Sequence, residues 1–331
     1  MPGTRERILD LANPGWVHCI SRCVRKAFLA GGRFAHRRGW VEERLKVLAG
    51  VFACEVGAYA VMSNHVHVVV RMDPEAAQGW SSAEVAERWC ALFGKTLPKG
   101  PDGRVEAGVV AGLAADAGWV AERRKRLGNL SWFMRALCED IARRANAEDD
   151  CTGRFWEGRF ASVPLLDQAA LIACMAYVDL NPVRAKLADR PERSAFTGVR
   201  ERIRARQRHR IGRRAVAPPS PESGLWLAPV EACAVDGLPA RERMTLDDYL
   251  TLVDATGRAL RAGKRGAIPR GLAPILARLD VSVEDWIATM TGWRTMAGGA
   301  VGHAAARVAE AGRRGVAWVR NRCPLFRRAA A

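Results

Sequence analysis

The sequence of 331 residues lacks the features of several protein classes. It has no apolar run of about 18 residues, which a membrane-spanning helix needs, and no secretory signal segment, so we expect a soluble cytoplasmic protein. Its nine cysteines are odd in number and form no CxxC pair, which argues against disulfides and for a reducing compartment. No GxxxxGK[ST] phosphate loop is present, so no nucleotide cofactor is expected.

Acidic residues are scarce relative to basic ones. The chain has 35 Asp and Glu against 52 Lys and Arg, a formal net charge of +17 and an isoelectric point near 10.3. Arginine dominates the excess, and its planar guanidinium suits phosphate contacts and stacking on bases. Nucleic acid is therefore the first partner to consider. Codon usage in a GC-rich genome would produce the same excess, so composition alone does not decide between the two causes.

The hydrophobic pattern of the N-terminal half predicts alternating strands and helices. The predicted strands are 15–23, 54–62, 65–72 and 153–165, and the predicted helices are 40–52, 130–149 and one from Asp167 to Pro182. The order β-α-β-β-α-β predicts an α+β fold of the ferredoxin-like or RRM-like split βαβ type. We expect a four-stranded antiparallel sheet with helices on one face, which leaves the other face available for a site.

Composition divides the chain into three parts. Residues 1–197 form the predicted first domain, in which the Ala-, Gly- and charge-rich segment of about 73–129 is a helical insertion. Residues 198–224 form an arginine-rich segment and linker, and 225–331 a basic helical C-terminal domain. The arginine-rich segment is either a solvated linker or an arm that grips a nucleic-acid backbone. We favour the arm because closely spaced arginines repel each other without an anion. Its candidate contacts are Arg204, Arg206 and Arg208.

Two histidines interrupt the apolar strand 65–72. Because alternate strand residues face the same side, His65 and His67 project together and can share one divalent cation. Burying both imidazoles without a metal, carboxylate or water would cost about 1–3 kcal/mol for each unpaired nitrogen. The alternative is a pair of histidines on the exposed face of an edge strand. His18, on the first strand, is expected to be a packing residue and not a ligand.

Tyrosine is rare, with three residues in the chain. Tyr177 precedes Asn181 by four positions, so the two side chains share one face of the predicted helix. A phenol and an amide oxygen would then belong to one site, the phenol as nucleophile and the amide as metal ligand. Alternatively, Tyr177 is a core residue and Asn181 with Pro182 only ends the helix.

Four segments occur in an order that resembles a known family. These are VHCISR, AYAVMSNHVHVVV, GRFWEGRF and AYVDLNPVRAKL. Together they resemble the single-tyrosine HUH transposases of the insertion-sequence type, and most of all the REP-associated tyrosine transposases. The resemblance covers about residues 15–194, except for the insertion, which is unusual for that compact family. The C-terminal region is not covered.

The resemblance implies a metal-dependent transposase or endonuclease that acts on single-stranded or hairpin DNA. It implies that Mg²⁺ or Mn²⁺ is held by His65, His67 and Asn181, and that Tyr177 attacks DNA to form a 5′-phosphotyrosine. Such an enzyme would work in the prokaryotic cytoplasm, associated with the nucleoid, as a monomer or a dimer. Two alternatives stay open, a domesticated protein that binds hairpin DNA without cutting it, and a replication-initiation or relaxase nuclease with the same chemistry.

Four arginines near the predicted motifs are candidate phosphate contacts, although each would also serve as a solvated surface charge. They are Arg22, Arg154, Arg159 and Arg184. Two aromatic residues of the predicted fourth strand, Trp156 and Phe160, are candidates for stacking on bases or, more simply, for core packing.

Overall fold

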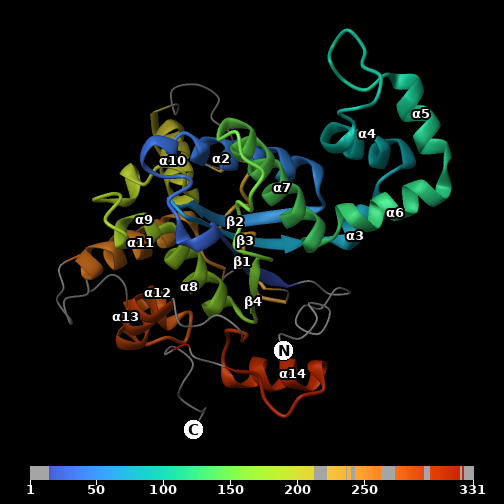
Figure 1. The fold of residues 1–331 in the computed structure, drawn as a ribbon. Helices are drawn as coiled ribbons and strands as arrows, with labels where there is room; N and C mark the ends of the chain where they lie inside the picture. The colour runs from blue at the N-terminus through green and yellow to red at the C-terminus, as the bar shows by residue number, and fades with distance from the viewer. Residues whose placement is uncertain are drawn as a thin grey trace.

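The computed structural model describes residues 15–211, 222–235, 237–239, 243–261, 273–293, 299–320 and 323. It has a four-stranded antiparallel sheet among helices, which confirms the predicted α+β class (Figure 1). The strands lie in the order β2-β3-β1-β4. Their bounds are β1 Trp16–Arg22, β2 Cys54–Val61, β3 His65–Met72 and β4 Ala161–Leu165.

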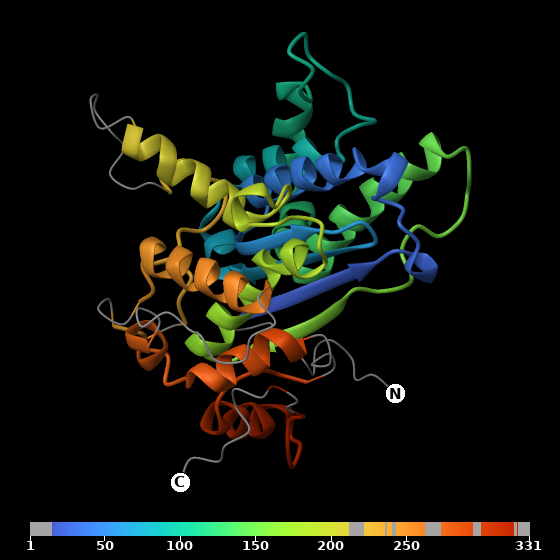
Figure 2. The ribbon, with the colours of Figure 1, turned by 90° about the vertical axis from the view of Figure 1, so that its left-hand side faces the viewer.

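Helices cover both faces of the sheet, so the prediction that they cover only one is wrong (Figures 1 and 2). Helices α2 (Arg37–Val51) and α7 (Leu130–Glu148) pack on the face that carries Val66, Val68 and Val70. Helix α8 (Gln168–Asp179) packs on the opposite face, which carries Val69. Both faces of the central strands are apolar enough to need cover, as in sheets that are buried on both sides.

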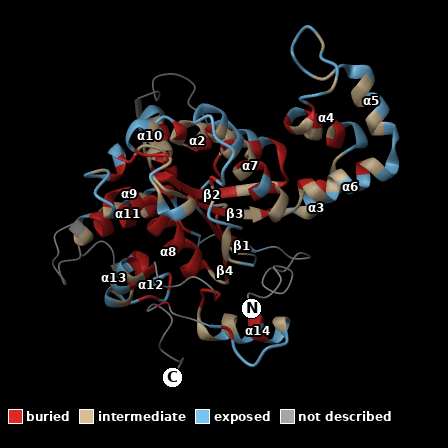
Figure 3. Ribbon diagram, in the orientation of Figure 1, coloured by how far each residue is buried: buried red, intermediate tan, exposed pale blue. Residues whose placement is uncertain are grey.

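Helix α8 is buried along its whole length (Figure 3). A helix that is apolar all round needs neighbours on every side. The sheet supplies one side, and the C-terminal helices supply the other. These are α11 Leu246–Arg261, α12 Ala273–Ala277 and α13 Val283–Gly292. Helix α14, Ala304–Arg314, begins beside the start of α8, where the backbone N–H and the ring of His303 contact Asp167. Several described parts of the C-terminal region therefore share one hydrophobic core with α8. The predicted boundaries of the three parts of the chain stay predictions.

Two predicted elements differ in form from the structure. The fourth strand was expected over 153–165, but β4 covers only Ala161–Leu165. Residues 152–160 form a loop that stays beside the end of β1 through a single bridge between Trp156 and Cys23, and Phe155 and Trp156 pack into the core with α7. The arginine-rich segment begins as helix α10 (Gly198–Ile211), in which Arg202 is buried and paired with Glu222 at 2.8 Å.

The insertion forms four helices that extend from the body of the molecule (Figure 1). Their bounds are α3 Pro74–Gly79, α4 Ser82–Phe93, α5 Ala107–Ala115 and α6 Ala117–Leu127. Among the described residues, no helix is both long and apolar enough to span a membrane.

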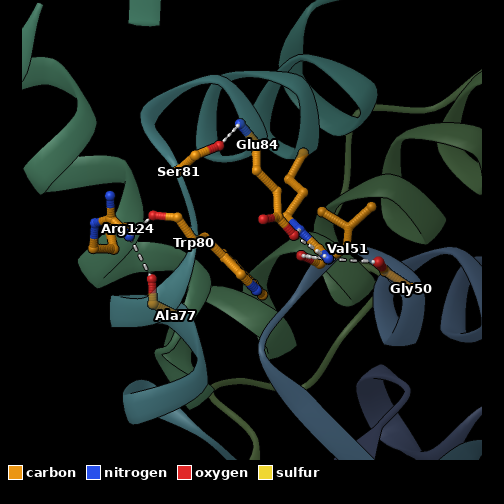
Figure 4. A network of polar contacts seen from close by, with 8 residues as sticks. Gly50, Val51, Ala77, Trp80, Ser81, Glu84 and Arg124 are labelled. Atoms are coloured by element: carbon orange, nitrogen blue, oxygen red, sulfur yellow. Dashed lines mark hydrogen bonds and ion pairs between the residues drawn. The ribbon is translucent and has the colours of Figure 1, made fainter.

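Two arginines tie the insertion together and to the body. Arg88 donates to the carbonyls of Gly50, at 2.8 Å, and Val51, at 3.2 Å, at the end of α2. Arg124 donates to the carbonyls of Ala77 and Trp80, both at 2.6 Å, which joins α6 to the α3–α4 turn (Figure 4). The last carbonyls of a helix have no partner within the helix, so a cationic side chain that donates to them stabilises the helix end. The root of the insertion is thus held to α2.

A buried carboxylate joins α8 to α10 and α11. Asp179 accepts hydrogen bonds from the hydroxyl of Tyr249, at 2.6 Å, and from the backbone N–H of Val199, at 2.9 Å. Burial raises the pKa of Asp179 to about 6, against the opposing effect of the Arg202 guanidinium. The carboxylate depends on these donors, because an ionised group away from water is costly unless it is hydrogen-bonded.

We predict that Tyr249→Phe lowers the free energy of unfolding by about 2 kcal/mol, because a hydrogen bond to a buried carboxylate is lost. Urea unfolding at neutral pH measures this. The control is Asp254→Asn on the same helix, which breaks an exposed pair with Arg258 and should change stability by less than about 0.5 kcal/mol. Equal effects of the two substitutions would contradict the role given to Asp179.

Candidate active site

Strands β1 and β3 bring three histidines together. In the register of this pair, Arg22 lies opposite His65, and Ile20 lies opposite His67. His18 approaches His67 from the neighbouring strand, with 2.9 Å between His18 Nε2 and His67 Nδ1 and 5.0 Å between the stacked rings. The rings of His65 and His67 lie edge to face at 4.7 Å. His18 is therefore more than the packing residue that its sequence context predicts.

Helix α8 carries Tyr177 to this cluster. The helix begins at Asp167, whose side chain accepts from the N–H of Ala170 at 2.9 Å, and Tyr177 lies on the side facing the sheet histidines. Its ring centre is 5.8 Å from that of His67 and 6.3 Å from that of His18. Asn181 follows as the first residue of α9 (Asn181–Arg184). His67, Tyr177 and Asn181 are 2%, 3% and 8% exposed, so these three side chains are nearly withdrawn from solvent.

Two of the predicted ligands have buried polar atoms without a partner among the described residues. Nε2 of His67 and the amide nitrogen of Asn181 make no hydrogen bond there. Nitrogen and oxygen of an amide are assigned from their neighbours, so a half-turn would present the Asn181 oxygen instead. Leaving such groups unpaired is costly, and a bound ion is one way in which proteins satisfy them.

The surroundings of His67 and His18 favour neutral imidazoles. Burial lowers the pKa of His67 well below its ordinary value, and His18, His65 and the arginines 22 and 184 lower it further. Burial also lowers the pKa of His18 to about 3. Metal ligation needs neutral imidazole, which this environment supplies.

Two imidazoles and one amide oxygen would make a donor set that suits Mn²⁺ and leaves positions for phosphate or water. Within the described ranges, no group of three or more His, Cys, Asp or Glu side chains is arranged to hold a metal.

Sequence reasoning missed Trp293, which follows α13. Its ring stacks on that of Tyr177, with centres 5.4 Å apart and planes 24° apart, and its Nε1 donates to His18 Nδ1 at 3.5 Å. Arg184 also lies over the Tyr177 ring, with its guanidinium carbon 4.7 Å from the ring centre. Arg184 in turn donates to the Thr291 carbonyl at 3.1 Å. No local pattern signals Trp293, because only tertiary packing brings α13 to α8.

Three predicted phosphate contacts lie at the His65 end of the sheet. Arg22 ends β1 and is exposed. Arg154 and Arg159, also exposed, belong to the 152–160 loop, which is fixed to β1 because the N–H of Glu157 donates to the Arg22 carbonyl at 2.8 Å. Arg22 therefore lies beside His65, and the loop that carries the other two arginines, here called the basic rim together with Arg22, is joined to the same end of β1.

The remaining predicted contacts lie elsewhere. Arg204 and Arg208 are exposed on α10, which packs beside β2, whereas Arg206 pairs with Asp247 of α11. Trp156 donates its indole N–H to the Cys138 carbonyl at 2.7 Å, so it serves the core.

No family model and no curated protein matches the chain. Among solved structures, one of a REP-associated tyrosine transposase bound to a REP hairpin is similar, with a TM-score of 0.33 and 13% sequence identity. The match covers 57% of this chain and 79% of that one. This structural similarity is distant.

We predict that His67→Ala lowers the affinity for Mn²⁺ at least about tenfold, because it removes a neutral, buried ligand. Electron paramagnetic resonance of free Mn²⁺ in a titration measures this without any substrate. His36→Ala is the matched control, since that histidine is half exposed and pairs with Glu148 of α7. If His67→Ala bound Mn²⁺ as tightly as the wild type, His67 would not be a metal ligand.

Proposed function

We propose that this protein is a metal-dependent DNA strand transferase of the HUH type, in which Tyr177 is the nucleophile. The observation that carries the proposal is the meeting of Tyr177 with His67, whose buried Nε2 makes no hydrogen bond to the described residues. Asn181, with its own unpartnered amide nitrogen, follows one helical turn later. A fold that needed only packing would fill these positions with apolar side chains.

The residues divide the work of phosphodiester cleavage. His65, His67 and Asn181 would hold Mg²⁺ or Mn²⁺, which when bound neutralises phosphate charge. The oxygen of Tyr177 forms a bond to phosphorus and its proton is released. The bond from phosphorus to the 3′ oxygen then breaks, and this oxygen takes up a proton. The 5′-phosphotyrosine keeps the bond energy, so the reverse attack by a 3′-hydroxyl joins strands without a nucleotide cofactor.

The basic rim supports a single-stranded or hairpin DNA substrate. Arg22 lies opposite His65, and Arg154 and Arg159 belong to the loop joined to Arg22; all three are exposed and could contact an incoming backbone. An unpaired strand lets a phosphate approach a side-chain nucleophile that lies close to the sheet. Arg204 and Arg208 of α10 would extend the same electrostatic attraction along the surface.

We also infer that the fold is the split βαβ arrangement of ferredoxin-like and RRM-like domains. The strand order β2-β3-β1-β4, with α2 after β1 and α7 before β4, supports this inference. On this interpretation α8 is an addition that carries the nucleophile to the face opposite α2 and α7.

One observation favours a second function. Tyr177 is almost fully buried, and Trp293 covers its ring, so the structure also fits a domesticated protein that binds hairpin DNA without cutting it. The two functions differ in whether a covalent intermediate forms.

We predict that hairpin oligonucleotides from the protein's genomic neighbourhood form a covalent adduct with the protein in Mn²⁺, and that Tyr177→Phe abolishes it. A denaturing gel measures the adduct, and EDTA should remove it. Tyr59→Phe is the control, since Tyr59 is equally buried but contacts Glu42 on the other face of the sheet. Binding without an adduct, in wild type and both variants alike, would favour the binding protein.

A further inference from the structure

A chain of three rings ends at the unpartnered nitrogen of His67. The indole nitrogen of Trp293 lies 3.5 Å from His18 Nδ1, and His18 Nε2 lies 2.9 Å from His67 Nδ1. Beyond it, His67 Nε2 is buried and makes no hydrogen bond within the described part of the chain. All three residues are at most 4% exposed, so bulk water does not replace these contacts.

The first member of this chain fixes the protons of the others. An indole N–H only donates, so His18 Nδ1 must accept and carries no proton. The single proton of His18 is then on Nε2, which donates to His67 Nδ1. That nitrogen therefore accepts, and the proton of His67 lies on Nε2. Two donors would face each other if either imidazole were doubly protonated, so both rings are neutral by this geometry alone.

We propose that Trp293 is a positioning residue that acts through His18 to hold His67 in the tautomer whose Nε2 carries a proton and cannot ligate a cation. When Trp293 leaves, His18 Nδ1 is free to carry a proton. His18 Nε2 then accepts from His67 Nδ1–H, and the lone pair of His67 Nε2 becomes available. Each ring keeps one proton and stays neutral. The outer partner of a ligating histidine sets its tautomer in the same way at metal sites.

The same release uncovers the nucleophile, so cation binding and access to Tyr177 are coupled. Trp293 stacks on Tyr177, and the neighbouring Thr291 carbonyl accepts from Arg184, which itself lies over the phenol ring. By linkage, a cation on His67 disfavours the docked form of Trp293 to the same extent that docked Trp293 disfavours the cation. This coupling rests on the proposed function of the site, and it adds a closed state to it.

Two substitutions separate the hydrogen bond of Trp293 to His18 from the stacking of its ring on Tyr177. Trp293→Phe keeps an aromatic ring over Tyr177 but has no N–H, whereas Trp293→Ala removes both. We expect Trp293→Phe to raise the Mn²⁺ affinity about three- to tenfold, the effect of one buried hydrogen bond. Trp293→Ala should raise it at least as much. Trp318→Phe is the control, because Trp318 is 70% exposed.

The decisive readout is the tautomer itself, measured by long-range proton–nitrogen NMR correlation of ¹⁵N-histidine-labelled protein. Wild type without metal should show His18 and His67 both protonated on Nε2, and Trp293→Phe should shift both toward Nδ1. A wild-type His67 protonated on Nδ1 would overturn the proposal, and this measurement needs no variant to fold. Equal Mn²⁺ affinity of wild type and a folded Trp293→Phe would overturn it as well.

Neither readout depends on DNA cleavage. The tautomers and the Mn²⁺ affinities would behave as expected even if no covalent adduct formed, in which case only the proposed transferase activity would fail. The opposite pair of results is also possible. If a covalent adduct required Tyr177 but the tautomers of His18 and His67 did not change in Trp293→Phe, the proposed role of Trp293 would be wrong and the proposed transferase activity would stand.

Discussion

The burial of α8 is the constraint on which the rest of the structure depends. Every residue of this helix is buried, so it lies between the sheet and the C-terminal helices and cannot occupy a surface. Helix α13 is part of this cover, and Trp293 at its end contacts both Tyr177 and His18, so the cover also reaches the nucleophile candidate.

The histidine cluster is the polar exception within this apolar layer. Three imidazoles and an amide lie where valine or leucine would stabilise the fold more, and two of their nitrogens make no hydrogen bond to any residue that the structure describes. Natural proteins accept such a cost mainly at functional sites, where local rules conflict with the requirements of chemistry. The buried Asp179 with Tyr249 and Arg202 differs, because its donors satisfy it.

The sequence could predict what short-range patterns determine. Strand alternation placed His65 and His67 on one face, helical spacing placed Asn181 one turn after Tyr177, and Asp167 marked the start of α8. Patterns could not show which faces of the sheet are covered or what His18 contacts, because these depend on packing between distant segments. Arg206 illustrates the limit, since its partner Asp247 comes from another helix.

The two ways in which the C-terminal region holds α8 differ in strength. Tyr249 of α11 donates to a buried carboxylate at 2.6 Å, whereas Trp293 makes a stacking contact and one long hydrogen bond of 3.5 Å. Short hydrogen bonds to charged groups are about twice as strong as neutral ones. The hydrogen bond of Trp293 is therefore the weaker of the two, and burial of its ring, which is 4% exposed, contributes most of its hold on α8. Partial openings that leave most of the fold intact are common in proteins. On the proposed function, release of Trp293 would let a strand reach Tyr177 without unfolding the helix that carries it.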